Sequence, residues 1–105
     1  MTITKDYEGL QLIEDEYYKL DCDLMSNEDM SIELDKPLRV CGNIKAVGDI
    51  KAEGDIDAGG YIYAGGSIYA GGNIDAGGYI DAVGYIYAGG DIDAGGYIKE
   101  GEKDE

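Results

Sequence analysis

Apolar residues recur with a six-residue period over most of the chain. From Gly42 to Glu100 the sequence can be written without a gap as units of the form G-x-I-x-A-x, and only the last unit departs from it, with Glu100 in the place of Ala. The isoleucines of these units are Ile44, Ile50, Ile56, Ile62, Ile68, Ile74, Ile80, Ile86, Ile92 and Ile98. Isoleucine and alanine two positions apart face the same side of an extended strand, and the glycines that follow break the strand. Each unit therefore predicts one short strand and one corner, and all ten isoleucines are expected to lie inside the fold.

Outward-facing side chains repeat at a longer distance, and this distance sets the size of the coil. Like residues recur every 18 positions in four series: Asp55, Asn73 and Asp91; Asp57, Asp75 and Asp93; Tyr61, Tyr79 and Tyr97; Tyr69 and Tyr87. Neighbouring strands lie about 4.8 Å apart, so like side chains stack, with an acidic ladder on one face and tyrosine ladders on the other two. This period is typical of a solenoid. The predicted fold is an all-β triangular β-helix over residues 30–101, with three units per coil.

The segment 1–29 lacks this pattern. Leu10, Ile13 and Tyr17 recur at helical spacing beside a run of acidic residues, which predicts a short capping helix. A cap is expected because an open terminal coil exposes unpaired backbone groups and an apolar core. Residues 1–29 are therefore expected to form an acidic N-terminal cap, and residues 102–105 a charged tail.

Counting backward by six from Ile44 shows where the pattern weakens. Leu38 and Ile32 fit the apolar position, but the count fails across Ser26 to Asp29. Regular strands are therefore expected from about residue 30, with one earlier strand at residues 18–23. The invariant glycine of each unit is expected either to adopt a positive φ or to lie close to a neighbouring backbone.

The composition is that of one small, strongly acidic domain. The 105 residues carry a net charge of −15, which disfavours direct contact with nucleic acid or anionic lipid and favours a basic partner or simple solubility. No apolar run approaches the about 18 residues of a membrane span, and no leader is visible, so a cytoplasmic protein is expected. Cys22 and Cys41 are too few for a disulfide framework. They are expected to be reduced, partly buried thiols, although the sequence leaves their pairing open.

Catalytic chemistry is mostly missing from the sequence. The chain has no histidine, no phosphate-binding loop motif and no base that could activate its few serines. The left-handed hexapeptide acyltransferases resemble this chain in period, but that resemblance implies a histidine base, which the chain lacks. Closely spaced pairs such as Asp55 with Asp57 could act as acid and base or bind Ca²⁺, but no calcium-binding repeat of the right form accompanies them. We therefore expect no enzyme, no cofactor and no metal.

The acidic ladder has two interpretations. Exposed carboxylates about 5 Å apart repel by somewhat under 1 kcal/mol, so the ladder could be only a solvated face. Its regularity instead favours imitation of DNA, which carries one charge per about 1.7 Å of duplex. Stacked tyrosines likewise fit either packing or a protein interface. The candidate partner-binding residues are Asp55, Asp57, Asp75, Asp91, Asp93, Tyr61, Tyr79 and Tyr97.

Two resemblances to known protein families extend this interpretation. The units GDIKA, GDIDA and GNIDA resemble the repeats of bactofilins, bacterial cytoskeletal proteins, which implies a right-handed triangular β-helix and end-to-end polymerisation. A very small, strongly acidic chain without catalytic residues also resembles phage anti-CRISPR proteins, in particular inhibitors of type I effector complexes.

The expected function is therefore that of a DNA-mimic inhibitor that occupies the nucleic-acid-binding surface of a bacterial defence complex. The expected location is then the cytoplasm of the host cell, and the expected state a monomer or small homo-oligomer. The alternative is a bactofilin-like structural scaffold.

Overall fold

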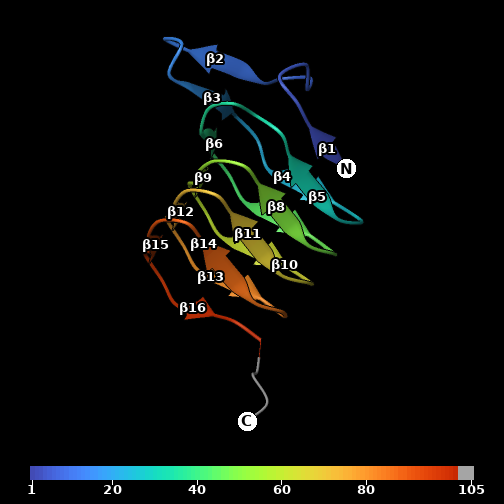
Figure 1. Ribbon diagram of the computed structural model, residues 1–105, viewed down its shortest axis with the longest axis vertical. Coiled ribbons are helices and arrows are strands. Elements are labelled where there is room, and N and C mark those ends of the chain that lie inside the picture. Colours follow the sequence, from blue (N-terminus) through green and yellow to red (C-terminus); the bar gives the residue numbers. More distant parts are fainter. Residues whose placement is uncertain (102–105) are drawn as a thin grey trace.

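The computed structural model describes residues 1–101, and every regular element in this part of the chain is a β-strand (Figure 1). The strands are β1 (Thr2–Ile3), β2 (Gln11–Ile13), β3 (Tyr17–Leu20), β4 (Leu24–Ser26), β5 (Met30–Ile32), β6 (Leu38–Val40), β7 (Ile44–Ala46), β8 (Ile50–Ala52), β9 (Ile56–Ala58), β10 (Ile62–Ala64), β11 (Ile68–Ala70), β12 (Ile74–Ala76), β13 (Ile80–Ala82), β14 (Ile86–Ala88), β15 (Ile92–Ala94) and β16 (Ile98–Lys99). The charged tail predicted at residues 102–105 lies outside the described residues.

The strands stack into three sheets that form the sides of a solenoid. Sheet A has the order β1-β5-β8-β11-β14, sheet B the order β2-β3-β6-β9-β12-β15, and sheet C the order β4-β7-β10-β13-β16. From β3 onward the chain passes through sheets B, C and A in turn, and each strand from β3 to β13 pairs in parallel with the strand one coil later. In sheet C, for example, Ile62 lies opposite Ile80 and Ala64 opposite Ala82, 18 residues apart. The predicted β-solenoid with 18-residue coils is confirmed.

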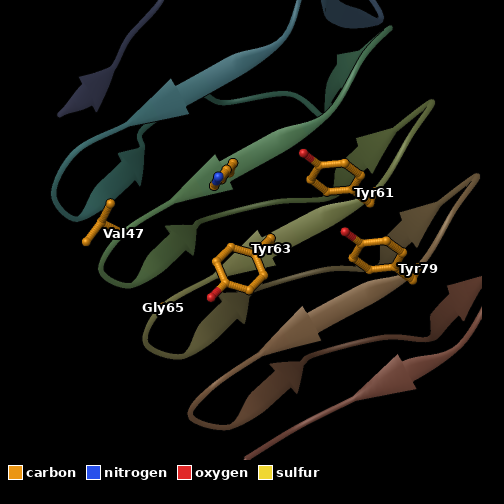
Figure 2. Close-up of a pocket in the computed structure, with 6 residues that line it drawn as sticks. Val47, Tyr61, Tyr63, Gly65 and Tyr79 are labelled. Atoms are coloured by element: carbon orange, nitrogen blue, oxygen red, sulfur yellow. The ribbon is translucent and has the colours of Figure 1, made fainter.

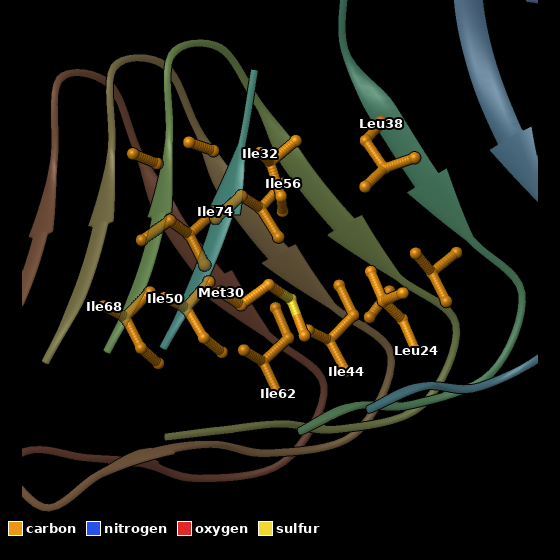
Figure 3. Close-up of a cluster of buried hydrophobic side chains, with 14 of the residues drawn as sticks. Leu24, Met30, Ile32, Leu38, Ile44, Ile50, Ile56, Ile62, Ile68 and Ile74 are labelled. Atoms are coloured by element: carbon orange, nitrogen blue, oxygen red, sulfur yellow. The ribbon is translucent and has the colours of Figure 1, made fainter. Parts of the chain in front are cut away.

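The core is a stack of identical side chains along the solenoid axis. The isoleucines from Ile44 to Ile80 have no exposed surface, and the alanines of the same strands are also buried. Figure 3 shows the isoleucines of adjacent coils lying side by side, as Ile50 does with Ile68 and Ile44 with Ile62. Burial of each isoleucine contributes roughly 1.5–3 kcal/mol. The expectation that all ten isoleucines are inside is wrong for Ile92 and Ile98, which are 36% and 46% exposed, because no later coil covers them within residues 1–101.

The predicted N-terminal capping helix is wrong. The segment forms β1 at the end of sheet A and an antiparallel hairpin of β2 and β3 at the end of sheet B. Glu14 and Asp15 make the hairpin turn with φ values of 51° and 57°. Alternation in β3 places Tyr18 and Leu20 in the core, where the sheet offers them strand partners in β6. Strand pairing therefore overrides a helical spacing of three apolar residues.

The solenoid already includes strands before residue 30. The backward count by six misses them because the first coil is two residues longer than the others. Tyr18 pairs with Leu38 and Leu24 with Ile44, each 20 residues apart, whereas Leu38 pairs with Ile56 at 18. The longer connection lies between β5 and β6 and buries Leu34. Its two extra residues displace all earlier strands by two positions relative to the six-residue repeat. As a result, β4 lies in the region where a backward count by six finds no strand.

The glycine corners depend on close approach and not on backbone handedness. Among the described residues, the only glycine with a positive φ is Gly9. A Cβ built on Gly72 would instead lie 1.9 Å from Oδ1 of Asp55, one coil earlier. A Cβ on Gly77 would lie 2.3 Å from the carbonyl oxygen of Gly59. Of the two expected reasons for invariant glycine, close approach is the one observed, with the exception of Gly54, where a Cβ would meet nothing within 4 Å.

Candidate protein-interaction surface

The outward face of sheet B carries a column of three carboxylates, which we call the acidic column. Asp57 of β9, Asp75 of β12 and Asp93 of β15 occupy the central position of consecutive strands and lie directly opposite one another. None of these side chains faces the core, because the flanking isoleucine and alanine of each strand point inward. The structure therefore brings together three of the five candidate aspartates in one row along the solenoid axis.

The other two candidate aspartates lie at the corner that precedes sheet B. Asp55 Oδ1 accepts a hydrogen bond of 2.7 Å from the backbone N–H of Asn73, and Asn73 Oδ1 accepts one of 2.8 Å from the N–H of Asp91. We call Asp55, Asn73 and Asp91 the corner column. Its side chains tie each coil to the next, and the neutral Asn73 separates the two charges.

The same bond recurs at the other corners of the solenoid. Asn43 accepts from the N–H of Tyr61 at 2.9 Å, Asp49 from Ser67 at 2.8 Å, and Ser67 from Tyr85 at 3.0 Å. Aspartate, asparagine and serine all fill this position. The bond therefore needs a short side-chain acceptor but no charge, and the corner itself also accepts tyrosine, which fills the same position of the unit at Tyr61, Tyr79 and Tyr97.

Arg39 ends the acidic column on its N-terminal side. It lies opposite Asp57 in the register of β6 and β9, and its Nε donates to Asp57 Oδ2 at 3.3 Å. Its guanidinium carbon also lies 4.6 Å from the centre of the Tyr17 ring, a cation–π contact. Reasoning from sequence did not include Arg39 in the site, although its position 18 residues before Asp57 was a usable signal.

The electrostatics of the acidic column are clearest at its central member. The pKa of Asp75 is raised from its ordinary value, first by burial and then by the charges of Asp57 and Asp93, while Arg39 acts in the opposite direction. Like charges on adjacent strands disfavour ionisation of the residue between them. The column is therefore a place where a cation from outside would relieve repulsion.

The candidate tyrosines form a second column at the corner between sheets B and C, which we call the tyrosine column. The rings of Tyr61 and Tyr79 lie 4.8 Å apart and those of Tyr79 and Tyr97 4.9 Å apart, with interplanar angles of 1° and 2°. A separate pair, Tyr69 and Tyr87, stacks on sheet A at 5.2 Å. Burial, followed by the neighbouring Tyr61 and Tyr97, raises the pKa of Tyr79.

An open groove runs beside the tyrosine column on sheet C. Figure 2 shows Tyr61 and Tyr79 side by side, with Tyr63 across from them and Val47 at the far end. The groove has a volume of about 410 Å³ and is also lined by Lys45, whose Nζ lies 5.9 Å from the centre of the Tyr63 ring. Aromatic rings beside a lysine form an amphipathic surface of the kind found at protein interfaces.

The thiols do not belong to this surface. Cys22 and Cys41 are free, and both are exposed, so the expectation of partly buried thiols is wrong. Each follows shortly after a strand of sheet B, at a corner where side chains point to solvent. The Cys41 thiol donates to Asp21 Oδ1 at 3.3 Å, and this bond is the main reason that the pKa of Cys41 is raised. A raised pKa lowers the thiolate fraction and hence the reactivity of the thiol.

The acidic and tyrosine columns together are suited to binding by charge and by aromatic contact.

Within residues 1–101, no three acidic or cysteine side chains converge on a point that could hold a metal ion. The described part of the chain also has no helix of the length and apolarity that crossing a membrane requires. Comparison with protein-family models, with curated proteins and with solved structures gives no match.

Proposed function

We propose that this protein is a non-catalytic inhibitor that binds the basic, nucleic-acid-binding surface of another protein by imitating a phosphate backbone. The observation that carries the proposal is the acidic column, in which three strands in register present a carboxylate at the same position. Together with Asp55 and Asp91 it places five carboxylates on one side of three coils. The net charge of −15 adds long-range attraction to a basic partner.

The charge density of this side is that of a single nucleic-acid strand. Five carboxylates over three coils of about 4.8 Å each give about one charge per 3 Å. DNA carries one charge per about 3.4 Å of each strand and per about 1.7 Å of the duplex. The face is therefore less dense than a duplex, and it offers one backbone-like row with the tyrosine column beside it.

Arg39 shows within the chain how a cation fits this face. Its guanidinium is held by Asp57 on one side and by the Tyr17 ring on the other. A partner's arginine near Asp75 or Asp93 would gain the same kind of charged hydrogen bond, and the tyrosine column would supply aromatic surface.

The finer assignment is to a DNA-mimic inhibitor of the anti-CRISPR type, acting on a type I effector complex in the host cytoplasm. It is supported by the small size, the absence of histidine and the acidic surface. The partner is then a protein complex built to hold nucleic acid, and the protein itself does not bind nucleic acid or membrane.

The test is competition with DNA for a purified type I effector complex, with a variant that carries Asp→Asn at Asp55, Asp57, Asp75, Asp91 and Asp93. Asparagine keeps the size of the side chain and the corner acceptor, as Asn43 and Asn73 already do in this chain. Five surface contacts of a few tenths of a kcal/mol each predict a loss of at least about tenfold in affinity. Binding of the parent should also weaken as salt increases.

The matched control neutralises five exposed acidic residues outside this face: Asp6, Glu8, Glu14, Asp15 and Glu28. It removes the same charge and should leave binding within about twofold of the parent, since these residues contribute only to the long-range field. Equal loss in both variants would show that net charge alone acts, and no loss in the first variant would exclude the acidic column as the binding face.

The alternative, a bactofilin-like scaffold, is favoured by one observation, the exposure of Ile92 and Ile98 at the C-terminal end. A polymer needs two complementary ends, however, and the N-terminal end is covered by β1 and by the hairpin of β2 and β3. Filaments of the full chain seen by electron microscopy at physiological salt would decide for the scaffold.

A further inference from the structure

The two ends of the solenoid differ in how they are covered. At the N-terminal end, Ile3, Leu20 and Leu24 are at most 2% exposed. At the C-terminal end, Ile92 is 36% and Ile98 is 46% exposed, although they occupy the same position as isoleucines that are fully buried one coil earlier. Within the described residues, β14, β15 and β16 are the last strands of their sheets. The C-terminal end therefore presents strand edges around exposed apolar residues.

The N-terminal end is closed by several independent contacts. The strand β1 completes sheet A, and the hairpin turns its outer strand β2 antiparallel to the stack. The amino group of Met1 lies 2.9 Å from a carboxylate oxygen of Glu28 and donates to the carbonyl oxygen of Asp29. The N-terminal end therefore offers no edge that matches the C-terminal end. Association through the C-terminal end stops at two copies and does not continue into a filament.

One of the three C-terminal edges is already occupied. Glu100 Oε1 accepts from the N–H of Ile86 in β14 at 3.1 Å. One coil earlier, the equivalent N–H of Ile68 donates to the carbonyl oxygen of Tyr85 at 2.8 Å. Glu100 therefore takes the place of the missing coil on sheet A. No side chain within residues 1–101 does the same for β15 or β16, so the open edges belong to sheets B and C.

We propose that the C-terminal end is a homodimer interface in which β15 of each copy pairs with β16 of the other. A two-fold axis perpendicular to the solenoid axis reverses strand direction, so the new pairs are antiparallel. Pairing β15 with β16 of the second copy places Asp93 opposite Lys99, and the symmetry makes this contact twice. Opposite charges directly across a strand pair are favourable and like charges are not.

The charges select this orientation among the possible two-fold arrangements. Pairing β15 with itself would set Asp93 against Asp93, and pairing β16 with itself would set Lys99 against Lys99. The selected arrangement also buries Ile92 and Ile98 of both copies and leaves the capped edge of β14 outside the new strand pairs. The contact is confined to one end of a narrow solenoid, so it belongs with small, readily reversible interfaces.

Salt dependence separates this inference from the proposed function. Each copy carries a charge of −15, so screening of the repulsion between copies should strengthen the dimer as salt increases. Binding of a basic partner to the acidic column should instead weaken. The dimer does not depend on the proposed function, and either can fail without the other.

The experiment is sedimentation velocity of the full chain over micromolar to millimolar concentrations at two salt concentrations. We expect a reversible monomer–dimer equilibrium that shifts toward the dimer at higher salt. The variant Ile98→Asp should weaken it by at least about tenfold, since it adds a charge at an apolar contact. Met25→Asp is the matched control, because Met25 is 55% exposed but lies on β4, the first strand of sheet C. It should leave the equilibrium unchanged.

The orientation is tested by exchanging the charges. Asp93→Lys and Lys99→Asp should each weaken the dimer, and the double variant should restore it to within about threefold of the parent, since the charge pair is re-formed. A monomer at every concentration, an oligomer larger than a dimer, an equal effect of Met25→Asp, or a double variant no better than either single one would each overturn the proposal.

Discussion

The glycine corners provide the sharpest test of how this fold is held together. Gly54 and Gly72 occupy the same position in successive coils, and neither has a positive φ. A Cβ on Gly54 would meet nothing within 4 Å, whereas a Cβ on Gly72 would lie 1.9 Å from Asp55 Oδ1. Alanine at either position therefore reduces the entropy of the unfolded chain equally. In the folded protein, however, only alanine at residue 72 collides with a neighbouring side chain.

The expected magnitudes follow from that contact. Gly54→Ala should stabilise the protein by about 0.4–1 kcal/mol, since alanine reduces the entropy of the unfolded state. Gly72→Ala gains the same amount but displaces Asp55 from the N–H of Asn73, a bond of 2.7 Å to a charged acceptor. Loss of such a bond costs about 1.5–3 kcal/mol. The two variants should therefore differ by about 1.5–3 kcal/mol in the free energy of unfolding.

The assay is urea denaturation followed by circular dichroism, with Asp55→Ala added as the second arm of a double-mutant cycle. Once Asp55 is truncated, the side-chain obstacle above residue 72 is gone and only the backbone nitrogen of residue 55 remains near the added Cβ, at 3.3 Å, so Gly72→Ala should cost much less in that background. Equal effects of Gly54→Ala and Gly72→Ala, or an undiminished cost of Gly72→Ala beside Asp55→Ala, would refute close approach as the reason for glycine at the corners.

Three further predictions concern the core, the acidic column and the C-terminal edge. Ile74→Ala should lower the free energy of unfolding by about 2–5 kcal/mol, and Ile98→Ala by less than half as much, both measured by urea denaturation, since Ile74 is fully buried and Ile98 is 46% exposed. The raised pKa of Asp75 means that the folded state binds this proton more readily than the unfolded state, so the contribution of Asp75 to thermal stability should rise as the pH falls from neutrality toward the ordinary aspartate value of 3.8. Asp35, whose pKa is lowered by the hydrogen bond from Tyr18, contributes in the opposite direction, so the contribution of Asp75 is measured as the difference between the parent and Asp75→Asn over this pH range. Glu100→Ala leaves the N–H of Ile86 without its acceptor and should speed hydrogen exchange of this amide relative to that of Ile68 by about tenfold, the factor that corresponds to about 1.4 kcal/mol.

The regular part of this fold could be predicted from the sequence because the repeat is nearly free of exceptions. Once isoleucine and alanine alternate between glycines, only one coil length places Asp57 above Asp75 and Tyr61 above Tyr79, and the structure has that register. Each residue is then located by its position in the unit. The same logic places the tyrosine column and the acidic column on separate parts of the surface.

The N-terminal part could not be predicted in this way, because the longer connection before Pro37 shifts the frame by two residues. A backward count in the wrong frame places Ser26 at the isoleucine position, whereas it occupies the alanine position in β4. The spacing of Leu10, Ile13 and Tyr17 favoured a helix, but the open edge of β6 provides a strand partner that local spacing does not reveal. Arg39 was missed because its role depends on its partner one coil later, Asp57, and not on its own neighbours in the sequence.

The acidic column has no structural task that explains its composition, and this is the strongest reason to assign it a function. At the corners, a side-chain oxygen binds the next coil, and Asn43 and Ser67 do so as well as aspartate. At the centre of the strands of sheet B, Asp75 makes no such bond to any described residue, and it repels each neighbour by about 0.8 kcal/mol at a separation of about 5 Å in water. Threonine or another uncharged β-former would fold at least as well there. The proposed cationic partner would account for a column that, within one chain, costs stability and binds nothing among residues 1–101 beyond Arg39. That proposal requires Asp75→Asn to restore stability while binding falls.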